Sequence, residues 1–112
     1  MKFGGICITT DNLLRLVEFY KVVFDMQPFI EGEHYSFGPV AIYNPSKETP
    51  KRDKSIWLQC FTNDIDKEYS RLVESIPDIV TVSPPERRPW GAYSFWFEDP
   101  DGNRIAVAQI NS

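Results

Sequence analysis

The chain has 112 residues and a formal net charge of −4 at pH 7, and these two values already exclude several classes of protein. The length suits a single domain over residues 1–112. No apolar run approaches the roughly 20 residues that span a bilayer, and an acidic chain lacks the basic surface that phosphate backbones require. We therefore expect no membrane and no nucleic acid among its partners.

Cysteine content and the first residues indicate the compartment. The two cysteines, Cys7 and Cys60, accompany a beginning, Met1 to Gly5, that lacks the long apolar stretch of an export signal. This combination predicts a cytoplasmic protein with free thiols. Aromatic residues make up 14 % of the chain, including three tryptophans, and we expect part of this aromatic surface to line a binding site.

In chain order, the first half predicts a strand, a helix and three short strands. An apolar strand over 6–10 precedes Asp11 and Asn12, either of which can cap a helix. The helix has an apolar stripe at three- and four-residue steps: Leu13, Leu16, Val17, Tyr20 and Phe24. The three β-prone runs that follow cover residues 28–31, 35–37 and 40–43.

The second half predicts the same series of elements. A strand over 58–62 precedes a helix that Asn63 or Asp64 caps and Pro77 ends. Strands follow over 79–83, 93–98 and 104–110, with an exposed loop over 84–89 and a turn over 99–103, in which Asp99 and Asp101 cap the backbone. The segment 45–55, which is rich in Pro and charge, is expected to join modules 1–44 and 56–112.

Aligning Asn12 with Asp64, an offset of 52, superposes the two halves. Few residues are identical, so the order of elements is what supports the repeat. The predicted fold class is α+β, with two βαβββ modules.

Alternation along each strand assigns its residues to two faces. Ile6, Ile8, Leu58, Cys60, Ile105 and Val107 are expected to lie against the helices. The other face then carries Gly5, Cys7, Thr9, Trp57, Gln59, Phe61, Ala106, Ala108 and Ile110. Small residues mixed with a tryptophan and an amide are typical of a ligand cup, although a face that packs on another chain or on a loop would look the same.

Two motifs resemble the vicinal oxygen chelate superfamily of glyoxalase I, bleomycin resistance proteins and extradiol dioxygenases. The first is Asn12-Leu13 followed by Phe19-Tyr20, and the second is Trp90-Gly91 with the turn over 98–105. The resemblance implies two modules with curled mixed sheets that form a cup, and in many members of this length a homodimer. One departure is Asp25, where members often carry the glycine that ends the helix.

The resemblance also implies four metal-ligand positions that hold His, Gln or Glu in the enzymes of the family. In this chain those positions are Gly5, Trp57, Ala106 and the strand over 40–42, and none offers a side-chain lone pair to a hard cation. We therefore expect no metal and no other cofactor. His34, the chain's one histidine, is either an exposed turn residue or a ligand contact.

The leading hypothesis is a metal-free protein that sequesters a small aromatic or drug-like molecule in a tryptophan-lined cup. The alternative is a glyoxalase-like, metal-dependent lyase, isomerase or dioxygenase. Arg87 and Arg88 could meet an anion, but a solvated loop is the simpler interpretation. Alternation does not decide which face Trp96 occupies. The candidate ligand-binding residues are Cys7, His34, Trp57, Gln59, Trp90 and Trp96.

Overall fold

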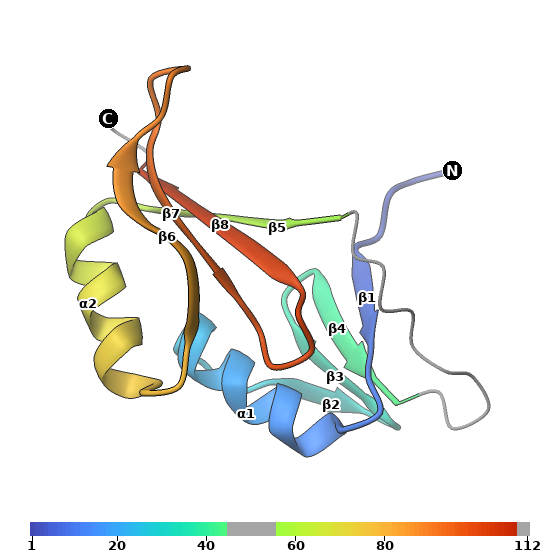
Figure 1. Cartoon of the computed structure of the whole chain (residues 1–112). Helices are drawn as coiled ribbons and strands as arrows, with labels where there is room; N and C mark the ends of the chain where they lie inside the picture. Colours follow the sequence, from blue (N-terminus) through green and yellow to red (C-terminus); the bar gives the residue numbers. More distant parts are fainter. Residues whose placement is uncertain (45–55, 110–112) are drawn as a thin grey trace. The chain divides into compact units, whose positions relative to one another are not determined.

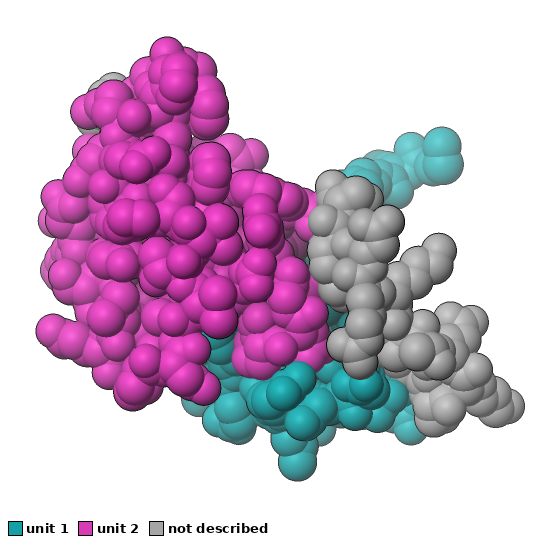
Figure 2. All heavy atoms as spheres, in the orientation of Figure 1, with its two compact units in different colours: residues 1–52 teal, residues 53–112 magenta. Residues whose placement is uncertain are grey.

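A computed structural model describes residues 1–44 and 56–109 of the chain. These residues belong to two compact units, 1–52 and 53–112, which Figure 2 shows in different colours. The predicted joint over 45–55 and the end of the last strand at Ile110 lie outside the described residues.

The first unit is a helix packed on a four-stranded mixed sheet (Figure 1). In the sheet order β1-β4-β3-β2, strand β1 pairs parallel with β4 and the other pairs are antiparallel. Leu16, Tyr20 and Ile42 are completely buried between helix and sheet. The elements are β1 (Ile6–Thr9), α1 (Leu13–Phe24), β2 (Phe29–Glu31), β3 (His34–Phe37) and β4 (Val40–Tyr43).

The second unit repeats this architecture, and neither sheet closes on itself. In the order β5-β8-β7-β6, strand β5 pairs parallel with β8, and the remaining pairs are antiparallel. Its elements are β5 (Leu58–Thr62), α2 (Ile65–Ser75), β6 (Val80–Arg87), β7 (Tyr93–Glu98) and β8 (Arg104–Gln109). The two βαβββ modules predicted from the sequence are confirmed, and so is the α+β class.

Both helices begin in the same way, at the offset that the repeat predicted. Asn12 and Asp64 are the N-caps, and their side chains accept from the backbone N–H of the residue three positions on. Two residues before each cap, Thr10 and Thr62 accept from the backbone N–H of the cap residue itself. A side chain that satisfies an orphan donor at the helix start stabilises it by about 1 kcal/mol.

The prediction of a loop over residues 84–89 is wrong for most of these residues. Strand β6 continues through Pro84 and Pro85 to Arg87, and Glu86 pairs with Ser94 of β7. The sequence signal misled because prolines weaken a strand assignment, yet β6 is an edge strand, where a missing N–H costs no ladder bond. Register shifts on either side of Ser83 accommodate the proline pair.

The apolar stripe predicted for the first helix is buried against its sheet. In α2, Ile65 and Leu72 are buried, whereas Val73 is 40 % exposed. In the turn after β7, Asp99 caps the backbone as expected, since its Oδ1 accepts from the N–H groups of Asp101 and Asn103. Among the described residues, neither helix is long and apolar enough to cross a membrane.

Asp25 ends α1 in the left-handed conformation, with φ 50° and ψ 50°. That region disfavours residues with a β-carbon, and glycine adopts it without steric cost. Asp25→Gly should therefore raise the free energy of unfolding by about 0.5–1 kcal/mol. Urea unfolding with an unchanged m-value measures the gain, and Asp25→Ala is the control. An Asp25→Gly variant no more stable than Asp25→Ala would contradict this account.

Candidate functional site

One face of the second sheet carries small side chains between larger ones. In the register of the strands, Ala106 of β8 lies between Gln59 of β5 and Trp96 of β7. The next row places Ala108 between Phe61 and Ser94. Because β8 separates β5 from β7, the larger side chains stand about 10 Å apart at their backbones. We call this surface the open face, made by residues 57, 59, 61, 94, 96, 104, 106 and 108.

The structure decides the orientation of Trp96. Its neighbours Phe95 and Phe97 are buried, and the Phe95 ring meets Tyr69 of α2 edge to face at 5.2 Å. Trp96 points to the opposite side of the sheet, where its ring lies 5.2 Å from that of Trp57 at an interplanar angle of 77°. Trp96 lies directly opposite Ala106, whose methyl group leaves space on this side of β8 for the contact between the two indoles.

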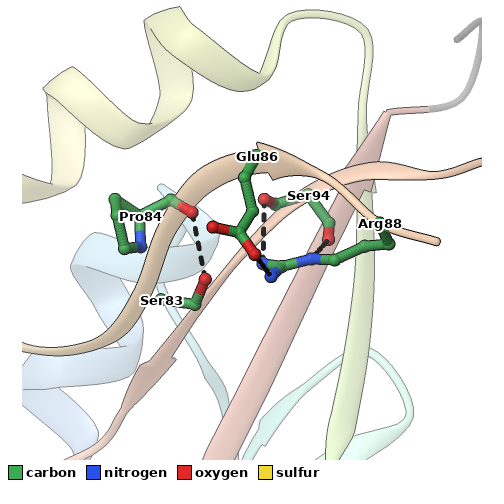
Figure 3. Close-up of polar contacts among 5 residues, drawn as sticks. All are labelled: Ser83, Pro84, Glu86, Arg88 and Ser94. Carbon is green, nitrogen blue, oxygen red and sulfur yellow. Dashed lines mark hydrogen bonds and ion pairs between the residues drawn. The ribbon is translucent and has the colours of Figure 1, made fainter.

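Arg88 covers one face of Trp96, with its guanidinium carbon 3.9 Å from the ring centroid. Its Nε donates to Ser94 Oγ at 2.8 Å, and a terminal amino group donates to the Ser94 carbonyl at 3.1 Å (Figure 3). The other amino group donates to Glu86 at 2.6 Å. Arg88 is only 5 % exposed, so its assignment to a solvated loop is wrong. Arg88 directly follows the end of β6, and from there its side chain reaches back to Ser94 of β7.

Arg104 is the counterpart of Arg88 on the other indole. Its guanidinium carbon lies 5.4 Å from the centroid of Trp57, and its Nε donates to Glu98 at 3.2 Å. The side chain is 42 % exposed. The residues Arg88, Trp96, Trp57 and Arg104 thus form one continuous series of contacts, which we call the arginine–tryptophan cluster.

In the first sheet, Cys7 and His34 share the face turned away from α1. Phe37 contacts the rings of α1, so alternation places His34 on the other side, where it stacks on Tyr43 at 4.5 Å. Cys7 lies opposite Ala41 on the same side. Two strand spacings and two residues separate Cys7 from His34, about 12 Å between their Cα atoms. That separation is too long for a thiol–imidazole hydrogen bond.

Trp90 lies outside the arginine–tryptophan cluster. It sits in the turn between β6 and β7, where Gly91 N–H donates to the Arg88 carbonyl, and it is 70 % exposed. Of the six candidate residues, the structure therefore gathers Trp57, Gln59 and Trp96 on the open face of the second sheet. It places Cys7 and His34 in the first unit.

Sequence reasoning missed the two arginines of the cluster. Arg104 has the same strand parity as Ala106, so alternation along β8 was a signal that could have found it. Arg88 gave no such signal, because its place depends on the extra length of β6 and on the hairpin that follows.

Comparison with known proteins supports the resemblance. The family model described as Glyoxalase/Bleomycin resistance protein/Dioxygenase superfamily matches residues 2–107. A search of curated proteins gives no match.

Solved structures share the fold. One is a protein of unknown function from Agrobacterium tumefaciens str. C58, at 21 % identity and TM-score 0.81, covering 97 % of this chain and 94 % of the other. A superfamily member from Sphaerobacter thermophilus DSM 20745 is 23 % identical, with TM-score 0.76 and coverages of 97 % and 98 %. A protein from the mobile metagenome of V. Pseudocholerae is 24 % identical, with TM-score 0.76 and coverages of 100 % and 96 %.

The residues at the implied metal positions do not fit a divalent cation. Gly5 and Ala106 have no donor atom, and the Trp57 indole N–H donates but cannot accept. Residues 40–42 of β4 are Val, Ala and Ile. Over the described ranges, 1–44 and 56–109, no three His, Cys, Asp or Glu gather closely enough to hold a metal ion.

The backbone at Gly5 adds a steric obstacle. Its φ is +140°, and a β-carbon built there would lie 2.3 Å from the carbonyl oxygen of Pro39. That carbonyl accepts from the Ile6 N–H at 2.9 Å, so the backbone at the start of β1 and just before β4 is drawn close together. A side chain at position 5 therefore requires the two segments to separate.

Gly5→Ala should lower the free energy of unfolding by about 2 kcal/mol or more, because the methyl group collides with backbone. The matched control is Gly4→Ala, where a β-carbon would meet nothing within 4 Å. Chemical denaturation of both variants measures the difference. Equal stability of the two variants would show that the close approach at Gly5 is absent in solution.

The two thiols should react at different rates. Burial first, and then the charge of Glu68, raise the pKa of Cys60 above its usual 9.0, whereas Cys7 is exposed. At pH 8 we expect a disulfide reagent to label Cys7 about tenfold faster or more, since reaction needs an accessible thiolate. The labelling rate of Cys60 should approach that of Cys7 only above pH 9. There the native state also loses stability, because the Cys60 thiol has its lower pKa in the unfolded chain and ionises there first. Single-thiol variants Cys7→Ser and Cys60→Ser report each rate, and equal rates at pH 8 would refute the assignment.

Proposed function

This chain belongs to the Glyoxalase/Bleomycin resistance protein/Dioxygenase superfamily, and we propose that it binds a small aromatic molecule without a metal. The observation that supports this most strongly is the set of residues at the four implied metal positions. Three of them are Gly5, Trp57 and Ala106, and the steric block at Gly5 makes a simple restoration of that ligand impossible. Fold alone does not fix chemistry, so these residues are the main support for the proposal.

The open face of the second sheet has the chemistry of an aromatic binding surface. Phe61 is 63 % exposed and Trp57 is 38 % exposed, while the neighbouring strand β8 presents only the small side chains of Ala106 and Ala108 beside them. Ring stacking on such side chains contributes about 0.5–1.5 kcal/mol beyond the area buried. Several contacts together reach the ~8 kcal/mol that corresponds to a micromolar dissociation constant. Gln59, exposed beside them, supplies a polar contact.

A homodimer in the cytoplasm is part of the same proposal. Exposed apolar residues on the edge strand β2 support a partner chain, since Phe29 is 67 % and Ile30 is 56 % exposed. An unpaired strand edge with apolar side chains is unfavourable in water.

We include Cys7 and His34, on the outward face of the first sheet, among the polar residues available to a ligand.

A screen of aromatic and glycopeptide compounds tests the function. We expect ligands that quench tryptophan fluorescence and raise the melting temperature. Trp57→Ala should weaken binding about tenfold, because a central aromatic contact is removed. The matched control Trp90→Ala, at an exposed turn, should change affinity less than about twofold. Absence of any quenching or thermal shift would refute the proposal.

Metal analysis of the purified protein separates the proposal from the enzymatic alternative. We expect no stoichiometric Ni, Zn, Fe or Mn after purification without chelators. A stoichiometric ion, together with lyase, isomerase or dioxygenase activity that chelation removes, would establish the alternative. Gly5, Trp57 and Ala106 would then not be the coordinating positions of this chain.

A further inference from the structure

We propose that the ligand is a planar aromatic carboxylate and that Arg104 recognises its anionic group. This inference rests on the proposed function, since it specifies the ligand class of the same open face. It depends on the arginine–tryptophan cluster, in which an exposed cation lies beside an exposed indole.

The availability of Arg104 is the first argument. It uses Nε to bind a single oxygen of Glu98 at 3.2 Å, and its side chain remains 42 % exposed. Across residues 1–44 and 56–109, no hydrogen bond from its two terminal amino groups is found. A planar guanidinium with free terminal donors matches a carboxylate through two parallel hydrogen bonds.

The position of Arg104 is the second argument. Its guanidinium carbon is 5.4 Å from the ring centroid of Trp57, which is itself 38 % exposed. A ligand that packs its ring on the exposed part of Trp57 therefore brings a ring substituent within reach of Arg104. This geometry selects a carboxylate attached directly to an aromatic ring.

Arg88 has a different task, because its donors are already committed. All three nitrogens of its guanidinium donate to Ser94 or Glu86, and the residue is buried. It holds Trp96 from one face, and Trp96 in turn meets Trp57. Arg88 is therefore a positioning residue that fixes the orientation of the indole pair.

The guanidinium groups beside the two indoles disfavour a cationic ligand. Each of the two indoles has a guanidinium near its ring, so the quadrupole that would attract a cationic ligand is already engaged. Glu98 lies opposite Arg104 in the register of the sheet and accepts from its Nε. This contact leaves the two terminal amino groups of Arg104 to face a ligand.

The test compares three probes of the same ring system: naphthoate, naphthamide and naphthylmethylammonium. Calorimetry gives their affinities for the full chain, and the three indole N–H resonances show where they bind. We expect naphthoate to bind about tenfold more tightly than naphthamide, since hydrogen bonds to charged groups are the stronger ones. We expect the ammonium probe to bind most weakly. The resonances of Trp57 and Trp96 should shift, and that of Trp90 should not.

Variants identify the arginine responsible. Arg104→Gln should abolish the preference for naphthoate, and Arg104→Lys should keep part of it, because lysine retains charge but loses the planar donors. The matched control is Arg87→Gln, an exposed arginine whose guanidinium also lies 5.4 Å from an aromatic ring, that of Tyr93. That variant should retain the full preference.

Each outcome supports or overturns the assignment. Equal binding of naphthoate and naphthamide would overturn this inference and leave the proposed function standing. So would a preference that survives in Arg104→Gln or disappears in Arg87→Gln. If none of the probes and none of the screened compounds binds, the proposed function fails, and this inference fails with it.

Discussion

The packing of one helix on one face of each sheet is the constraint on which the rest of the structure depends. Once Tyr20 and Leu16 of α1, or Ile65 and Leu72 of α2, are buried, strand alternation commits every residue to one of two faces. A shift of one residue in register would exchange the faces. The position of Trp96 on the outward side of β7 follows from burial of the phenylalanines beside it, and so does the existence of an open face.

The sequence predicted what depends on local pattern and failed where tertiary context decided. The two modules, the cap residues Asn12 and Asp64, and the capping role of Asp99 all follow from short-range chemistry, and all are confirmed. The extent of β6 does not, because prolines are tolerated only once the strand is known to lie at an edge. The burial of Arg88 depends in turn on that edge strand, so no local signal revealed it.

The arginine–tryptophan cluster changes how the aromatic residues are understood. Taken from composition, three tryptophans are three equivalent stacking surfaces. In the structure they differ: Trp96 has one face covered by Arg88, Trp57 is partly exposed beside the partly exposed guanidinium of Arg104, and Trp90 belongs to a turn. A rigid, partly shielded indole pair loses less conformational entropy on binding than mobile surface rings would, and such preorganisation is a main source of affinity.

The mismatch between the implied metal positions and a divalent cation involves backbone as well as side chains. Position 106 already carries a β-carbon, so its lack of a ligand atom is a matter of the side chain alone. At Gly5 the backbone would also have to move away from the Pro39 carbonyl. That movement would disturb the pairing of β1 with β4, which begins at the next residue of each strand. Two changes of different physical kinds must therefore coincide before a cation could be held at these positions. The aromatic surface needs neither change, and this difference is the main support for the proposal that the chain binds its ligand without a metal.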